Sequence, residues 1–114
     1  MVLSQLSGDP QKIASLNDAF RTTFLGGSIC VSAAVYELGA PFVKDALCAV
    51  RDFVSFTPDN DPHGEHDFGE IKLAGRELLW KIDYFDDRMI NAAENPADVE
   101  TTRRVLTVML QEEY

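Results

Sequence analysis

The clearest structural pattern in this chain is Ile71-Lys72-Leu73-Ala74-Gly75-Arg76-Glu77-Leu78-Leu79-Trp80-Lys81-Ile82-Asp83-Tyr84-Phe85. In its second half the residues Leu78, Trp80, Ile82 and Tyr84 alternate with Leu79, Lys81, Asp83 and Phe85. A period of two is that of a β-strand. A turn around Ala74-Gly75-Arg76 pairs this strand with Ile71–Leu73 in a hairpin. We expect the hairpin to hold the segment before it in a fixed position.

That preceding segment, Thr57–Glu70, combines acidic residues with turn formers. Five of its fourteen residues are carboxylates, and it contains both histidines of the chain, two prolines and two glycines. Proline and glycine oppose regular helix and strand, so the segment is predicted to be a loop. Binding and catalytic residues are often found on loops that a rigid scaffold positions. The loop is therefore the candidate functional segment.

Two helices and a strand are predicted before the loop. The first helix begins at Asp9-Pro10, an N-cap followed by proline, and ends before Gly26-Gly27. From Ser28 to Glu37 both faces are apolar or small, which predicts a central strand. The second helix runs from Gly39-Ala40-Pro41 to about Phe53, and its wide apolar arc predicts that it is mostly buried.

After the hairpin we predict a polar connector, Asp86–Glu94, and a last helix capped by Asn95-Pro96. The predicted buried face of that helix consists of Val99, Thr102, Leu106, Met109, Leu110 and Glu113. The fold class is then α+β, with a three-stranded, mostly antiparallel sheet and three helices in the order α-β-α-β-β-α. We expect a single domain over residues 9–114 and a flexible N-terminus over residues 1–8.

Charge narrows the class of partner. The formal net charge is −9, with fourteen acids against six bases in residues 58–114 and five against four in residues 1–57. This excess opposes direct binding of nucleic acid or of an anionic membrane and favours a basic protein partner. No apolar run approaches the roughly 20 residues of a membrane helix, so we expect a cytoplasmic protein. The oligomeric state is left open.

A divalent metal, calcium or zinc, is the one cofactor that the loop suggests. Asp59, Asp61, His63, Gly64, Glu65, Asp67 and Glu70 occupy positions 1, 3, 5, 6, 7, 9 and 12 of a calcium-loop pattern. His63 and Pro62 depart from that pattern, and a strand follows it instead of a helix. His63-x-x-His66 is alternatively a weak zinc signal. The candidate metal ligands are Asp59, Asp61, His63, His66 and Glu70.

Two other interpretations of the loop stay open. His63 or His66 with Glu65 or Asp67 suits acid–base catalysis, although no serine or cysteine nucleophile motif and no phosphate-binding glycine loop accompany them. The structural alternative is that turns are capped through side-chain bonds to the backbone, while the histidines donate to carboxylates and carbonyls. The capping residues would be Asp59, Asn60, Asp61 and Asp67. We consider an enzyme less favoured than a binding domain.

Four motifs resemble a small bacterial family known as domain-of-unknown-function family 3768. They are Ala14-x-Leu16-Asn17-Asp18-x-Phe20-Arg21, Phe56–Gly69, Trp80-Lys81-Ile82-Asp83-Tyr84 and Arg104-Val105-Leu106-Thr107-x-Met109-Leu110. The resemblance spans about residues 13–114 and implies a bacterial cytosolic context and a role for the loop. It implies no activity and no catalytic residue.

The leading hypothesis is a non-enzymatic acidic interaction module that binds a basic partner through the 59–70 loop and the end of the hairpin. One form of it is a nucleic-acid mimic that inhibits a DNA- or RNA-binding machine, as antirestriction and CRISPR-inhibitor proteins do. The alternative is a metal-dependent or His/carboxylate enzyme, hydrolase-like, that uses the same loop. The expected binding residues are Asp59, Asp61, His63, Glu65, His66, Asp67, Glu70, Asp83, Asp86 and Asp87.

Overall fold

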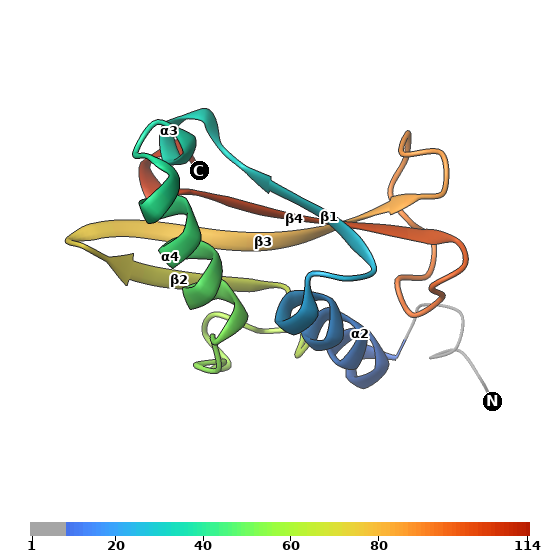
Figure 1. Ribbon diagram of the computed structural model, residues 1–114. Coiled ribbons are helices and arrows are strands. Elements are labelled where there is room, and N and C mark those ends of the chain that lie inside the picture. The colour runs from blue at the N-terminus through green and yellow to red at the C-terminus, as the bar shows by residue number, and fades with distance from the viewer. Residues whose placement is uncertain (1–8) are drawn as a thin grey trace.

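Four strands form one mixed sheet in the order β1-β4-β3-β2 (Figure 1). The computed structural model describes residues 9–114, so the N-terminus predicted to be flexible lies outside the described residues. The strands are β1 (Gly27–Val31), β2 (Phe68–Leu73), β3 (Arg76–Asp86) and β4 (Thr102–Leu110). β2, β3 and β4 are antiparallel neighbours, whereas β1 runs parallel to β4.

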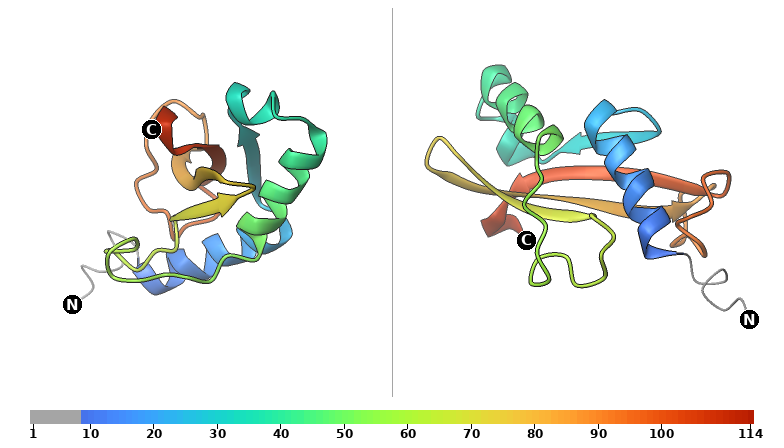
Figure 2. Two further views of the ribbon diagram at one scale, coloured as in Figure 1. Left: turned by 90° about the vertical axis from the view of Figure 1, so that its left-hand side faces the viewer. Right: turned by 90° about the horizontal axis from the view of Figure 1, so that it is seen from below.

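The helices pack on one side of this sheet (Figure 2). They are α2 (Pro10–Thr23), α3 (Ala33–Tyr36) and α4 (Ala40–Arg51), and a 3-10 turn, η1 (Gln111–Glu113), follows β4. The predicted start of the first helix is confirmed, because the Asp9 carboxylate accepts from the Gln11 amide at 3.0 Å. α4 follows Gly39 as predicted. It is half-buried, however, and only Ala46 and Val50 are fully covered, so the prediction of a mostly buried helix is wrong.

The predicted hairpin is confirmed. β2 and β3 are joined by the two residues Ala74 and Gly75, which have φ angles of 52° and 77°. Two consecutive left-handed residues are typical of the type I′ turn, whose twist matches that of the paired strands. Residues 57–67 of the predicted 57–70 loop are a loop, whereas Phe68–Glu70 are already paired in β2, so the strand begins three residues earlier than predicted.

The predicted strand Ser28–Glu37 is only half a strand. β1 ends at Val31, and the chain then forms the one-turn helix α3, in which the Ser32 hydroxyl caps the amide of Val35 at 3.2 Å. The residues Ser32-Ala33-Ala34 are compatible with a strand and with a helix, and the hydrogen bond to the serine cap favours the helix. β1 is also an edge strand and not a central one.

The predicted last helix is a strand. In β4 the residues Thr102, Arg104, Leu106, Val108 and Leu110 are buried and alternate with more exposed ones. Two of these buried residues are polar, which obscured the period of two in the sequence. Asn95 does cap a turn, since its side chain accepts from the Ala97 amide at 3.0 Å, but no helix follows. The class α+β therefore holds with three helices, whereas the sheet has four strands and is mixed.

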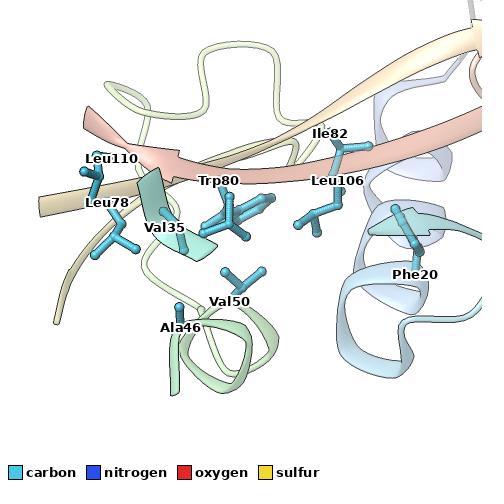
Figure 3. Close-up of a cluster of buried hydrophobic side chains, with 10 residues drawn as sticks. Phe20, Val35, Ala46, Val50, Leu78, Trp80, Ile82, Leu106 and Leu110 are labelled. Carbon is cyan, nitrogen blue, oxygen red and sulfur yellow. The ribbon is translucent and has the colours of Figure 1, made fainter. Parts of the chain in front are cut away.

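Trp80 is at the centre of the core (Figure 3). Its side chain is fully buried and lies between the sheet and Val50 of α4. Phe20 extends the same cluster towards α2. No helix among residues 9–114 has the length and apolar character needed to cross a membrane.

The substitution Gly69→Ala tests the packing around Trp80. A Cβ atom at Gly69 would lie 2.5 Å from Trp80 Nε1 and 2.8 Å from the Phe53 ring. Because the indole is buried and cannot move aside, we expect the free energy of unfolding to fall by about 1–3 kcal/mol. Urea denaturation measures it. Ala49→Gly on the half-buried helix α4 is the control, because it also changes one side chain by a single methyl group. It is expected to lower the free energy of unfolding by about 1 kcal/mol. A G69A variant as stable as the native chain would contradict this packing.

Candidate functional site

Asp61 holds the loop together from inside. Its side chain is almost fully buried, and one carboxylate oxygen accepts hydrogen bonds from the backbone amides of Glu65 and His66, both at 3.1 Å. Asn60 ties the preceding turn, accepting from the Thr57 amide at 2.9 Å and donating to the Ser55 carbonyl at 2.9 Å. These two side chains therefore have the turn-capping role of the structural alternative.

His66 fastens the loop to α2. Its Nδ1 lies 3.0 Å from both carboxylate oxygens of Asp18, and its Nε2 lies 3.7 Å from Asp61. The imidazole also stacks on the Phe56 ring, with a centroid distance of 4.0 Å and an interplanar angle of 3°. Because both ring nitrogens face carboxylates, His66 acts as a strut between the loop and the helix.

Arg21 joins this strut to the core. Its guanidinium is buried and donates to the carbonyls of Val50 and Arg51, at 2.9 and 3.0 Å, which are at the C-terminal end of α4. It also donates to Asp18 at 3.1 Å and lies 5.4 Å from the ring centroids of both Phe56 and Trp80. A cation is favourable at the C-terminus of a helix, where carbonyls lack partners.

A second buried network lies next to the first. Asn17 is fully buried and donates to the Glu65 carbonyl at 2.9 Å and to the Tyr84 hydroxyl at 2.8 Å. Its carbonyl oxygen accepts from Arg104 Nε at 2.7 Å. The Arg104 guanidinium also donates to the Pro96 carbonyl and lies 5.3 Å from the Tyr84 ring centroid. Burial lowers the pKa of Arg104 and raises that of Tyr84.

Glu65 and Asp67 converge on the Tyr84 hydroxyl. Tyr84 donates to Glu65 Oε1 at 3.0 Å, and its oxygen lies 3.5 Å from Asp67 Oδ2. Partial burial raises the pKa of Asp67, and the negative charge of Glu65 raises it further. Among residues 9–114, no lysine or arginine nitrogen lies within 4.0 Å of the carboxylates of Asp59, Glu65 or Asp67. Glu65 and Asp67 are both half-buried and repel each other, and neither forms an ion pair with a lysine or arginine of the described residues.

The outer side of the loop is more open. Asp59 and His63 are exposed. His63, His66 and Asp61 line an open pocket of about 470 Å³ together with Phe56 and Pro58. The loop thus has an inner side that is tied to the fold and an outer side that faces solvent.

The remaining acidic residues do not join the loop. Asp83 forms a 2.9 Å ion pair with Lys81 on the sheet face opposite Tyr84, and Glu70 is exposed on β2. Asp86 caps the turn at the end of β3, where bonds from backbone amides, chiefly that of Ile90, lower its pKa. Asp87 is exposed in that turn. The expected binding set is therefore divided between the loop, the open sheet face and the far turn.

The described residues do not provide a set of ligands for the metal ion suggested by the sequence. Within residues 9–114 there is no group of three or more His, Cys, Asp or Glu side chains arranged to hold an ion. In a calcium loop that begins at Asp59, Asp61 would be the next acidic ligand and Glu70 the last. Asp61 instead points inward to backbone amides, and Glu70 is on a strand. The calcium spacing in the sequence therefore does not become a coordination geometry here.

Sequence reasoning missed four residues that position the loop: Asn17, Asp18, Arg21 and Arg104. Asn17 and Arg21 follow Ile13 by four and eight residues, so they lie on the buried stripe of α2. A polar residue in an apolar helical stripe was the available signal. All four residues also lie in the motifs that carry the family resemblance, but the resemblance assigned them no role. The buried position of Arg104 was missed because its segment was interpreted as a helix.

Fold and site together define an α+β domain that presents a clamped acidic loop beside its sheet. The chain matches the family described as Protein of unknown function (DUF3768) over residues 31–113, and it belongs to that family. Comparison with curated proteins and with solved structures gave no match. The matched range includes the whole loop, whereas α2, with Asn17, Asp18 and Arg21, precedes it.

The substitution Asn17→Ala tests the buried network. It leaves the Arg104 guanidinium and the Glu65 carbonyl without their buried partner, so we expect the free energy of unfolding to fall by about 2–4 kcal/mol. Asn91→Ala is the control, because Asn91 is exposed and makes only a 3.5 Å contact with Asp86. Chemical denaturation of both variants measures the difference. Equal losses would contradict the role given to Asn17.

The substitution Asp67→Asn tests the repulsion between Glu65 and Asp67. The pKa of Asp67 is raised above its ordinary value of 3.8 in the folded protein, so folding favours the protonated acid. This contribution to stability is present below the unfolded pKa and is lost as pH rises through the folded pKa. The stability of D67N relative to the native chain should therefore increase from about pH 3.5 to pH 7.5. Urea unfolding across that range measures it, and a difference that is constant or shrinks would contradict the assignment.

Proposed function

We propose that the domain is a non-enzymatic module that binds a basic protein partner through the 59–70 loop, with a lysine or arginine side chain of the partner seated at Glu65 and Asp67. The carrying observation is the convergence of these two half-buried carboxylates on Tyr84, with no lysine or arginine of residues 9–114 in an ion pair with either. Burial raises the pKa of Asp67 and the charge of Glu65 adds to it, and a partner's cation between the two carboxylates would favour the ionised form of both.

The loop is held in a fixed conformation, and this supports a binding role. Side chains from α2 and from the loop itself hold its backbone at Glu65 and His66, although residues 59–67 contain neither helix nor strand. A binding surface that is already ordered loses less entropy when the partner docks. Long ordered loops in small domains commonly carry function.

The nucleic-acid-mimic form is a narrower version of this proposal. Mimicry needs carboxylates at repeated spacings on one surface, as phosphates are in a duplex. Asp59, Glu65 and Asp67 belong to the loop, whereas Asp83 and Glu70 lie on the open sheet face. The geometry therefore favours recognition of a short cationic segment, and competition with DNA for a basic peptide separates the two forms.

The enzymatic alternative depends on His66 or His63 as a general acid or base. The Asp18–His66 contact resembles an oriented catalytic imidazole, and a pocket lies beside it. The second ring nitrogen of His66, however, faces Asp61 and not a nucleophile. A binding role accounts for more of the geometry and is preferred.

Titration with a ten-residue lysine peptide tests the proposal. Amide chemical shifts in ¹⁵N NMR spectra should change most at residues 63–67, and the peptide should bind more weakly at higher salt. E65Q/D67N should weaken binding about tenfold or more, because two charge-assisted hydrogen bonds are lost. Both replacements keep the side-chain shape and an acceptor for Tyr84.

The matched control is D87N/E94Q, which removes the same charge from exposed positions outside the loop. If the control weakens the peptide as much as E65Q/D67N does, the attraction is only a general effect of net charge and the proposed site is wrong. Urea unfolding of E65Q/D67N beside the native chain separates lost binding from lost folding, because Glu65 also accepts from the Tyr84 hydroxyl.

A further inference from the structure

The two edges of the sheet differ in how they are protected. β2 carries the charged residues Glu70 and Lys72 along its edge, both exposed. β1, at the other edge, has the sequence Gly-Ser-Ile-Cys-Val and no charge. Charged residues on edge strands prevent pairing with other chains. β1 lacks this protection.

The free side of β1 has a definite set of hydrogen-bonding groups. The Ser32 amide donates to the Val108 carbonyl of β4 at 2.9 Å. Backbone groups alternate in direction along a strand, so those of Ser28 and Cys30 also face β4. The N–H and C=O groups of Gly27, Ile29 and Val31 consequently point to the open side. They form a ready template for another strand.

The segment that contains this edge strand is uncharged, although Glu113 accepts from the Ser32 hydroxyl at its C-terminal end and Lys44 lines the adjoining groove. The fifteen residues from Thr22 to Tyr36 contain no Asp, Glu, Lys or Arg, in a chain that is 25% charged. Leu25 and Tyr36 are 75% and 71% exposed. Tyr36 also lines an apolar groove of about 590 Å³, together with Phe24 and residues of α4. A partner for this edge should therefore also be uncharged and partly apolar.

We propose that this partner is a second copy of the chain, which pairs β1 with β1 in antiparallel orientation about a two-fold axis at Ile29. In that register Gly27 is opposite Val31 of the second copy, and Ser28 is opposite Cys30. All five residues of the strand pair, and two four-stranded sheets become one continuous sheet. The neutral segment meets its own equivalent, so no charge is buried, and the exposed Leu25 and Tyr36 side chains of both copies lie at the junction.

This inference does not depend on the proposed function, because the 59–70 loop adjoins β2 at the opposite edge (Figure 2). Sedimentation equilibrium tests it with the native chain. We expect a concentration-dependent mass up to twice the 12.7 kDa monomer between about 5 and 500 µM. A monomer over the whole range would overturn the proposal.

Cys30→Lys is the disrupting variant, because Cys30 is exposed on the open face of the edge strand. It should raise the dimer dissociation constant at least about tenfold, since a lysine on each edge opposes pairing. Val54→Lys is the control, with the same charge change at a position that is 81% exposed away from β1. Equal weakening by both variants would overturn the role of β1.

Disulfide trapping tests the register without destabilising the edge. The thiol introduced by S28C should lie opposite Cys30 of the second copy, in a pair whose Cα atoms are close enough to bridge. Mild oxidation of S28C should give a covalent dimer in high yield, while V54C should stay largely monomeric. A covalent dimer from the native chain through Cys30 alone would place the axis at Cys30 and overturn the Ile29 register. No covalent dimer from either chain would overturn the pairing itself.

Discussion

The buried charge of Arg21 is the constraint on which the rest of the structure depends. A guanidinium that is 3% exposed needs partners for its charge and donors, and here both terminal nitrogens have them, whereas the buried Nε has no hydrogen-bond partner among the described residues. Its partners come from four segments: the C-terminal carbonyls of α4, Asp18 on its own helix, the Phe56 ring before the loop and the Trp80 ring on β3. Because Asp18 also holds His66, satisfying Arg21 fixes the loop as well as the two helices.

The loop is consequently ordered by charges and amides and not by regular secondary structure. Asp61 and Asn17 satisfy the backbone of Glu65 and His66, where no strand or helix does so. Buried polar networks of this kind are rigid when complete and costly when one member is lost. The same arrangement leaves Glu65 and Asp67 facing each other at Tyr84. The scaffold therefore uses its cations, Arg21 and Arg104, for architecture and leaves the loop carboxylates with a surplus of negative charge.

Sequence patterns were informative where each buried face was apolar. The hairpin, α2 and α4 have apolar residues at the expected period, and their positions were predicted. β4 was not, because Thr102 and Arg104 occupy buried positions of its core face. The loop was also found from its composition, but its inner partners lie 48 residues away at Asp18 and Asn17. Whether an acid in such a loop points inward, as Asp61 does, depends on contacts that no local pattern encodes.

The chain separates its neutral and acidic surfaces across the sheet, and this separation makes self-association compatible with a net charge of −9. The sheet order puts β1 three strand spacings from β2, which the loop adjoins. At about 4.8 Å per strand, the loop is roughly 15 Å from a two-fold axis at β1 and roughly 30 Å from its equivalent in a second copy. The Debye length at physiological salt is about 8 Å, so repulsion between the two loops would be largely screened. Pairing at β2 would instead bring the acidic loops together, and the exposed charges of Glu70 and Lys72 oppose pairing at the same edge.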